Sequence, residues 1–123
     1  MTQRHLIAIV DDDALIRETL KDLLDSAGYT SAVFSSAQRF LKSKRLATVA
    51  CLITDMRMPG TTGIELHQKL VDAGHAIPTI LITAYRDETL RARALRAGIR
   101  CYLPKPVTSD ALLAGVDAAL EAR

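Results

Sequence analysis

The sequence predicts an α/β fold in which a doubly wound, five-stranded parallel sheet carries helices on both faces. Short apolar runs alternate five times with longer amphipathic segments along the 123 residues, which is typical of repeated strand–helix units. The central short runs are continuously apolar, which indicates that both faces of the sheet are covered. Parallel strands joined in this way need crossover connections, and these are expected to be right-handed.

The first strand is predicted at residues 6–10, where apolar residues precede a run of acids. Apolar residues at helical spacing follow it and end at Gly28, which supplies a stop signal. The second strand is predicted at 29–34, and its serine and threonine content favours an edge of the sheet. Ser35 and Ser36 then offer a cap for a helix that buries Phe40.

The third strand is predicted at 50–53 and leads to Asp55 and to a turn at 58–60 with the sequence Met-Pro-Gly. The helix that follows starts at about Gly63 and closes at Gly74. These two glycines therefore set the expected limits of the third helix.

The last two units have the same organisation. A strand is predicted at 79–82 and a helix at 87–97, which stops at Gly98. The fifth strand is predicted at 100–103, where a proline ends it. A final helix at 108–120 begins with a Thr-Ser pair that offers a cap.

Composition limits the classes of function. Hydrophobic residues make up 49% of the chain and aromatic residues 4%, so the core must be mostly aliphatic. A formal net charge of +2 does not demand a nucleic-acid partner. Neither a recognition helix nor an aromatic–basic platform is present, so we expect no direct nucleic-acid contact. No run approaches the ~20 apolar residues of a membrane span, and residues 1–5 lack signal-peptide features. We expect a cytoplasmic protein without membrane contact.

The cysteines and histidines show no metal-site pattern. Cys51 and Cys101 lie in apolar runs, at a spacing that fits no metal or redox motif, so we interpret both as reduced, buried thiols. His5, His67 and His75 have no mutual spacing that suggests a set of ligands, and we expect all three at the surface.

Polar residues follow the predicted strands at the edge where doubly wound sheets bind ligands. A single acid at such a place is ordinary, because an Asp often caps a helix or forms a turn. Several acids together with a lysine are harder to explain by local structure. The residues at this edge are Asp11, Asp12 and Asp13 after the first strand, Asp55 after the third, Thr83 and Ala84 after the fourth, and Lys105 after the fifth.

If the first and third strands are neighbours, Asp11, Asp12 and Asp55 converge. Two carboxylates about 5 Å apart repel by roughly 3 kcal/mol at an effective dielectric constant of 20. Such a cluster needs a proton, a cation or a lysine. Lys105 supplies one positive charge, which does not balance three carboxylates, so a divalent cation is the expected partner. Hard oxygen ligands favour Mg²⁺ or Mn²⁺.

This set of residues suits phosphoryl transfer to a carboxylate. Asp55 would be the nucleophile, while the cation and Lys105 would neutralise charge on the phosphoryl oxygens. The Thr83 hydroxyl would donate to one of those oxygens, and Ala84 is small enough to leave room for the group. The expected covalent product is an acyl phosphate on Asp55.

From about Leu6 to Leu120 the chain resembles the receiver domain of two-component response regulators. Four motifs carry the resemblance, in order and each at the end of a predicted strand. Any one of them alone would be a weak signal. The resemblance implies that residues 1–123 form one response-regulator receiver domain. The motifs are Val10-Asp11-Asp12-Asp13, Asp55-Met56-Arg57-Met58-Pro59-Gly60, Ile82-Thr83-Ala84 and Leu103-Pro104-Lys105-Pro106.

The resemblance implies a flavodoxin-like (CheY-like) sheet with the strand order 2-1-3-4-5. It makes Asp55 the phosphoacceptor in a reaction that depends on Mg²⁺ or Mn²⁺. It assigns metal coordination to Asp12, to Asp55 and to the Arg57 backbone carbonyl, with Asp11 reaching the metal through water. No key position is substituted, so nothing indicates a degenerate receiver.

The resemblance also implies a switch and its partners. Lys105 and Thr83 match the residues that contact the phosphoryl group, and Tyr102 matches the aromatic residue that moves with Thr83. The peptide bond between Lys105 and Pro106 is expected to be cis. Phosphorylation by a sensor histidine kinase would reshape the face formed by helix 87–97, strand 100–103 and the last helix, and this face is a possible homodimer surface.

Other functions fit less well. Asp11 and Asp13 are spaced as in haloacid dehalogenase-type phosphatases, in which the first strand bears the nucleophile and a later strand bears further acids. Here Asp55, after the third strand, is the acid followed by the Met-Pro-Gly loop, and no acid pair follows the fourth strand. No Gly-x-x-x-x-Gly-Lys-Ser/Thr run supports a nucleotide binder. A phosphorylation-silent interaction module would not need Asp55 and Thr83 together. We therefore expect a phosphoacceptor that assists its own phosphorylation and dephosphorylation, not an enzyme acting on external substrates.

The wider architecture stays open at this point. Either a free-standing regulator or the receiver part of a longer protein fits the sequence. Residues 55–60 and 103–106 look similar to those of receivers that precede a LuxR-type helix-turn-helix domain.

Overall fold

A parallel sheet forms the centre of the computed structural model, which describes residues 5–84 and 87–121. Its order is β2-β1-β3-β6-β7, and all neighbouring pairs are parallel. Counted along the chain, this is the predicted order 2-1-3-4-5, so the fold prediction is confirmed. The expectation of no signal peptide falls mostly on residues 1–4, outside the described residues. The sheet strands are β1 (Leu6–Val10), β2 (Thr30–Phe34), β3 (Val49–Asp55), β6 (Thr79–Thr83) and β7 (Cys101–Pro104).

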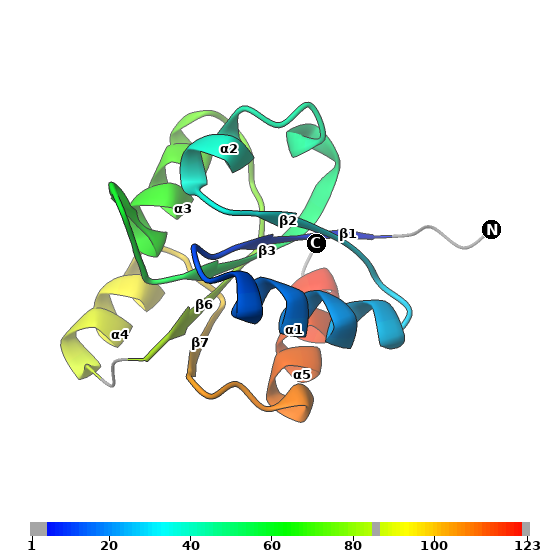
Figure 1. Cartoon of the computed structure of the whole chain (residues 1–123). Coiled ribbons are helices and arrows are strands. Elements are labelled where there is room, and N and C mark those ends of the chain that lie inside the picture. Colours follow the sequence, from blue (N-terminus) through cyan, green and yellow to red (C-terminus); the bar gives the residue numbers. More distant parts are fainter. Residues whose placement is uncertain (1–4, 85–86, 122–123) are drawn as a thin grey trace.

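Helices cover both faces of this sheet (Figure 1). In the core, α2, α3 and α4 share packing clusters with one face, and α1 and α5 share a cluster with the other. Within the described residues no helix combines the length and apolar character needed to cross a bilayer. The helices are α1 (Ala14–Ser26), α2 (Ala37–Leu41), α3 (Gly63–Asp72), α4 (Glu88–Arg96) and α5 (Ser109–Glu121), with a 3₁₀ turn at Leu46–Thr48.

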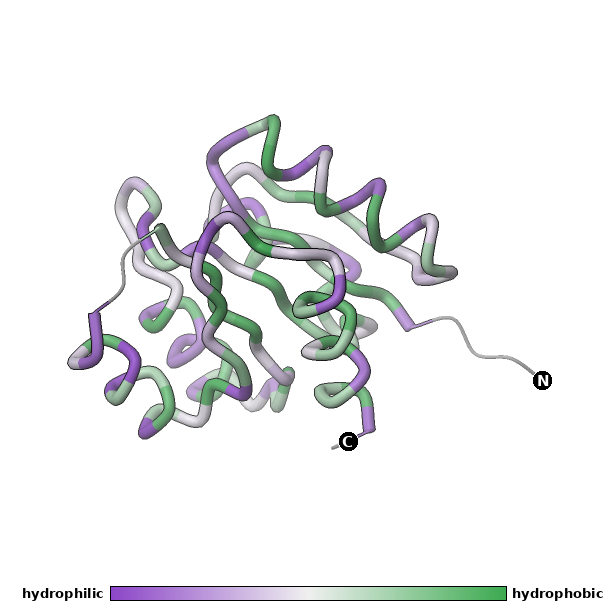
Figure 2. Tube along the Cα trace, turned by 90° about the horizontal axis from the view of Figure 1, so that it is seen from below, coloured by the Kyte–Doolittle hydropathy of each residue, from purple (hydrophilic) through white to green (hydrophobic). Residues whose placement is uncertain are grey.

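The strand β1 shows how the sequence sorts side chains between the two layers. Successive residues of a strand point to opposite faces. Ile7 and Ile9 therefore pack with Leu24 of α1, while Ala8 packs with Phe40 of α2. Every residue of β1 is buried, which accounts for its unbroken apolar run. Figure 2 shows the same arrangement, with apolar strands inside and polar positions recurring along the helices.

The helices that start at the carboxyl edge of the sheet carry side-chain caps. Asp13 accepts hydrogen bonds from the first turn of α1, and Asp87 does the same for α4. At α3, Thr62 and Glu65 form a capping box, with bonds of 3.1 and 2.8 Å. Thr108 accepts from the backbone N–H of Ala111 at the start of α5. These caps fix the loops at this edge.

A small hairpin lies in the segment that the sequence predicts only as a turn. Its strands β4 (Arg57–Met58) and β5 (Thr61–Thr62) are antiparallel. Pro59 and Gly60 join them, and Gly60 has φ = +83°, the left-handed conformation that favours Gly at the third position of a type II turn. The hairpin folds the chain back toward the end of β3.

His67 departs from the prediction that it lies at the surface. Its side chain is buried on α3, with 6% of the residue exposed. Nδ1 lies 2.9 Å from the Thr79 hydroxyl of β6, and Nε2 donates to the carbonyl of Ala97 at the end of α4, 3.0 Å away. Burial lowers the pKa of the imidazole, while the bond to Ala97 opposes this. The buried ring is accommodated because both nitrogens have polar partners. Of the two cysteines that were predicted to be buried, Cys51 is buried and Cys101 is only half-buried.

Candidate functional site

The candidate site lies where β1 and β3 end side by side. In their parallel register Val10 pairs with Thr54, so the next residues, Asp11 and Asp55, are neighbours at this edge of the sheet. The two residues are buried, with 0% and 9% of each exposed, while Asp12 is exposed. The adjacency that the sequence argument required is therefore present.

Asp11 is held from three directions. Its backbone N–H donates to the carbonyl of Phe34 in β2, 3.2 Å away. Its carboxylate accepts from the N–H of Asp13 at 2.9 Å, and its own carbonyl accepts from Nη1 of Arg17 at 2.7 Å. The turn from β1 into α1 is therefore fixed at both its backbone and its side chain.

Asp55 is held by the sheet itself. It is the last residue of β3 rather than a loop residue, and it pairs with Ile82 of β6. The next N–H along the chain, that of Met56, donates to the carbonyl of Ile82 at 2.9 Å. The Thr54 hydroxyl lies 3.1 Å from the Asp55 carbonyl and donates to it. The backbone of Asp55 is thus fixed, and its carboxylate is the part that joins the acidic cluster.

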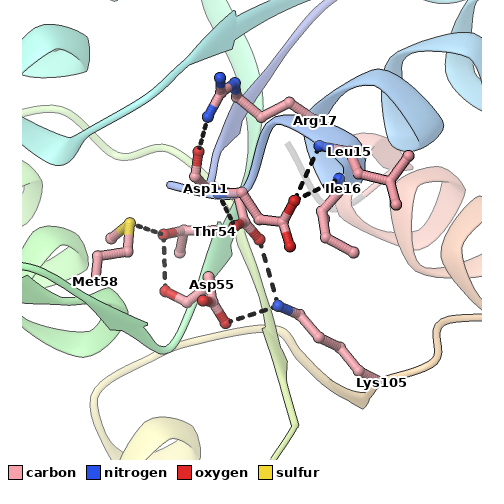
Figure 3. A network of polar contacts seen from close by, with 9 residues as sticks. Asp11, Leu15, Ile16, Arg17, Thr54, Asp55, Met58 and Lys105 are labelled. Carbon is pink, nitrogen blue, oxygen red and sulfur yellow. Dashed lines mark hydrogen bonds and ion pairs between the residues drawn. The ribbon is translucent and has the colours of Figure 1, made fainter.

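Lys105 lies between the two buried acids (Figure 3). Its Nζ is 3.5 Å from Oδ2 of Asp11 and 3.4 Å from Oδ1 of Asp55. Its backbone N–H donates to the carbonyl of Thr83, 2.7 Å away, and the Lys105–Pro106 bond is cis, as the resemblance implies. One ammonium group thus bridges two carboxylates.

The electrostatics of the cluster favour a further positive charge. Burial raises the pKa of Asp11, against the lowering effects of the Asp13 N–H and of Lys105. Burial also raises the pKa of Asp55, and the charge of Asp11 raises it further, while Lys105 lowers it. Both carboxyl groups therefore have a pKa above their ordinary value even with the lysine in place.

The described residues fit a hard divalent cation. Asp11, Asp12 and Asp55 each offer one carboxylate oxygen, and these oxygens lie within 4.8 Å of one another. Ligands of an octahedral ion at about 2.1 Å are roughly 3 to 4 Å apart, so small rotations would suffice. The donor set consists of oxygen atoms only, as Mg²⁺ and Mn²⁺ prefer.

The other residues predicted for the site lie on, or directly after, the strands β4, β6 and β7. Arg57 begins β4, and its side chain is exposed. Thr83 is the buried last residue of β6, and Ala84 after it is exposed. Tyr102 of β7 pairs with Leu81. Since alternate residues of a strand share a face, Tyr102 and Thr83 lie on the same face, the one that packs against α4. Because β6 lies between β3 and β7, Tyr102 is separated from the acids by one strand.

Arg17 supports the candidate site but was not among the residues predicted from the sequence. Its guanidinium group donates to the Asp11 carbonyl from the first turn of α1. The only signal in the sequence is a basic residue on a helix that directly follows an acidic run. A charge at that place is as typical of a solvated helix face as of a support for the site.

Comparison with known sequences identifies a family match. Residues 7–117 match the response regulator receiver domain. The transcriptional regulatory protein FixJ of Bradyrhizobium diazoefficiens is 36% identical over 120 residues, which cover 98% of this chain and 58% of that protein. The response regulator protein TmoT of Ectopseudomonas mendocina is 36% identical over 119 residues, or 97% of this chain and 54% of TmoT. The chain thus spans about half the length of the curated relatives it matches.

Solved structures give the same result. The response regulator StyR superposes with a TM-score of 0.89 at 40% identity, covering 98% of this chain and 61% of that one. The crystal structure of FixJ-N superposes with a TM-score of 0.90 at 30% identity, covering 99% of this chain and 98% of that one.

Proposed function

Because the chain belongs to the response regulator receiver domain family, which acts in two-component signalling, we propose that it accepts a phosphoryl group on Asp55 in a reaction that needs Mg²⁺ or Mn²⁺. The donor would be a sensor histidine kinase. We extend the receiver assignment to residues 1–123. The observation that carries the proposal is the convergence of three carboxylates within 4.8 Å, with the Lys105 ammonium beside two of them.

Each residue has a role that follows from its place. Asp12, Asp55 and the Arg57 carbonyl would hold the cation, with Asp11 reaching it through water. Such a cation neutralises charge on the phosphoryl oxygens. Lys105 would donate to one of these oxygens, as would the Thr83 hydroxyl at the end of β6.

In the proposed transfer, a carboxylate oxygen of Asp55 attacks the phosphorus of a phosphohistidine. The new O–P bond forms as the P–N bond breaks, and the departing imidazole keeps the electron pair of the broken bond. The product is an acyl phosphate, a covalent carboxylate intermediate. Lys105, which now balances two carboxylates, would shift part of its interaction to the phosphoryl group.

The test is covalent labelling of the purified chain with acetyl phosphate, read by intact-protein mass spectrometry. We expect one phosphoryl group per chain with Mg²⁺ present and none after chelation with EDTA. Asp55→Asn removes the nucleophile at nearly constant shape and should abolish labelling. Asp72→Asn, an exposed acid on α3, is the matched control and should label like the wild type. Undiminished labelling of Asp55→Asn would refute the proposal.

An assay with p-nitrophenyl phosphate on the same purified protein distinguishes a receiver from a phosphatase. A haloacid dehalogenase-type phosphatase would turn over this substrate. We propose instead a signalling domain, in the cytoplasm, that catalyses only its own phosphorylation and dephosphorylation. FixJ is a transcriptional regulatory protein, which supports a transcriptional output for the full-length protein. The resemblance of residues 55–60 and 103–106 favours an output domain of the LuxR type, and we propose no direct nucleic-acid contact by residues 1–123.

The proposed output surface is the face formed by α4, β7 and α5. Tyr102 is half-buried there and shares a packing cluster with Leu81 and Ala94. Added charge at Asp55 would bias Thr83 and Tyr102 together, since both lie on the face toward α4. We expect any self-association of the phosphorylated chain, measured by light scattering, to be lost in Tyr102→Ala and kept in Tyr102→Phe. Association that is equal in wild type and Tyr102→Ala would contradict this switch.

A further inference from the structure

The first residue of α3 lies against the backbone of Asp55. Gly63 follows the hairpin β4–β5, and its N–H donates to the carbonyl of Met56, 2.8 Å away. The chain therefore leaves β3 at Asp55, passes through the hairpin and returns to the same place. The peptide group between Asp55 and Met56 is enclosed by this return.

The space at Gly63 has no room for a side chain. A Cβ atom there would lie 2.6 Å from the carbonyl oxygen of Asp55, 2.4 Å from Cδ1 of Leu81 and 3.2 Å from Cγ2 of Thr54. Contacts of carbon with other heavy atoms are normally about 3.5 Å or longer. The Leu81 contact is with the end of a side chain that can rotate, but the Asp55 contact is with backbone.

Gly63 differs in this respect from the other glycines, and all six lie in the described part of the chain. Four have a positive φ, which alone explains their identity. Gly115 on α5 would bring a Cβ to 3.4 Å from Sγ of Cys101. Only at Gly63 would a methyl group meet backbone at less than 3.0 Å.

We propose that Gly63 is a positioning residue for the phosphoacceptor: the missing side chain lets α3 close against the Asp55 carbonyl and sets where the Asp55 carboxylate stands relative to Asp12 and Lys105. The Met56 N–H is bonded to Ile82 of β6, so the peptide group has a fixed partner on one side and Gly63 on the other. A methyl group at Gly63 would displace this peptide. Misplacement of reacting groups by about 1 Å costs on the order of 100-fold in rate.

The inference rests on the proposed function and is tested with four variants of the whole chain. They are Gly63→Ala, Leu81→Val, the double variant Gly63→Ala/Leu81→Val, and Gly115→Ala as the matched control for an added helix methyl group. The double variant removes the Cδ1 atom that the new methyl group would meet but leaves the Asp55 contact. For each, the free energy of unfolding in urea, the affinity for Mn²⁺ and the rate of labelling by acetyl phosphate are measured where the chain is folded.

We expect Gly63→Ala to slow labelling by about 10- to 100-fold and to weaken Mn²⁺ binding. Gly63→Ala should lower the free energy of unfolding less in the Leu81→Val background than in the wild type. Labelling and Mn²⁺ affinity should stay low in the double variant. Gly115→Ala should label at the wild-type rate.

Three results would overturn the inference. The first is wild-type labelling and Mn²⁺ affinity in Gly63→Ala. The second is a double variant that recovers stability and site properties together, because packing against Leu81 would then explain everything. The third is failure of both Gly63 variants to fold, which would make Gly63 a requirement of the whole fold. Absence of labelling in the wild type would instead refute the proposed function, and Mn²⁺ affinity would still report on Gly63.

Discussion

Replacing Lys105 with methionine is expected to slow phosphoryl transfer to Asp55 by about 100- to 1,000-fold, the usual effect of removing a donor aimed at developing charge. The substitution keeps the length of the side chain and the backbone N–H that donates to Thr83. It removes the ammonium group that lies 3.5 and 3.4 Å from the carboxylates of Asp11 and Asp55. Rates of labelling by acetyl phosphate at saturating Mg²⁺ measure the effect.

A second lysine provides the control for this prediction. Lys44 is exposed between α2 and the 3₁₀ turn, and Lys44→Met should label at the wild-type rate. Lys105→Arg keeps the charge but changes its shape and its hydrogen-bonding geometry, so an intermediate rate is expected. A Lys105→Met protein that labels as fast as the wild type would show that the lysine serves only to balance the two acids.

Addition of Mg²⁺ or Mn²⁺ is expected to raise the free energy of unfolding by about 2.7 kcal/mol when the ion is present at 100 times its dissociation constant. The gain is expected because the proposed ion site is the folded cluster of Asp11, Asp12 and Asp55, whose carboxylates are dispersed in the unfolded chain. Urea unfolding with and without the ion measures it. Asp12→Asn changes the exposed carboxylate of this cluster and should lose most of the gain. An equal gain in Asp12→Asn would place the ion elsewhere.

The pH dependence in EDTA should have an unusual sign. Burial raises the pKa of Asp11 and Asp55 above the ordinary value of 3.8. Between that value and the raised pKa, the folded chain binds more protons than the unfolded chain, so these two groups make stability fall as pH rises. Mg²⁺ favours the ionised carboxylates, so its addition should remove this fall in stability with rising pH. Urea titrations of wild type and Asp11→Asn between pH 4 and 7 test it, and an identical pH slope in the two proteins would contradict it.

The acidic cluster was predictable because its two halves follow the most regular parts of the chain. Unbroken apolar runs identify β1 and β3 as buried parallel strands, and parallel strands end at the same edge of a sheet. The remaining step was adjacency of the two strands, which the pairing of Val10 with Thr54 bears out. The strand extends two residues beyond its predicted end at residue 53, since Asp55 is still part of β3 and pairs with Ile82.

Other features depend on contacts that a local pattern does not contain. The burial of His67 is explained by partners 12 and 30 residues away, the Thr79 hydroxyl and the Ala97 carbonyl, and nothing near His67 in the sequence indicates them. The strands β4 and β5 have two residues each, which is too short for alternation to be read. The Pro59-Gly60 pair between them was the available signal of a hairpin.

The hydrogen bond between His67 and Ala97 fixes the C-terminal end of α4. It ties the C-terminal end of the helix to α3, while the opposite end, at Glu88, follows Thr83 after a short connection. A tilt of α4 that preserves this bond would be a rotation about Ala97. The displacement in such a tilt grows with distance from Ala97, so it would be larger at Glu88 than at Arg96.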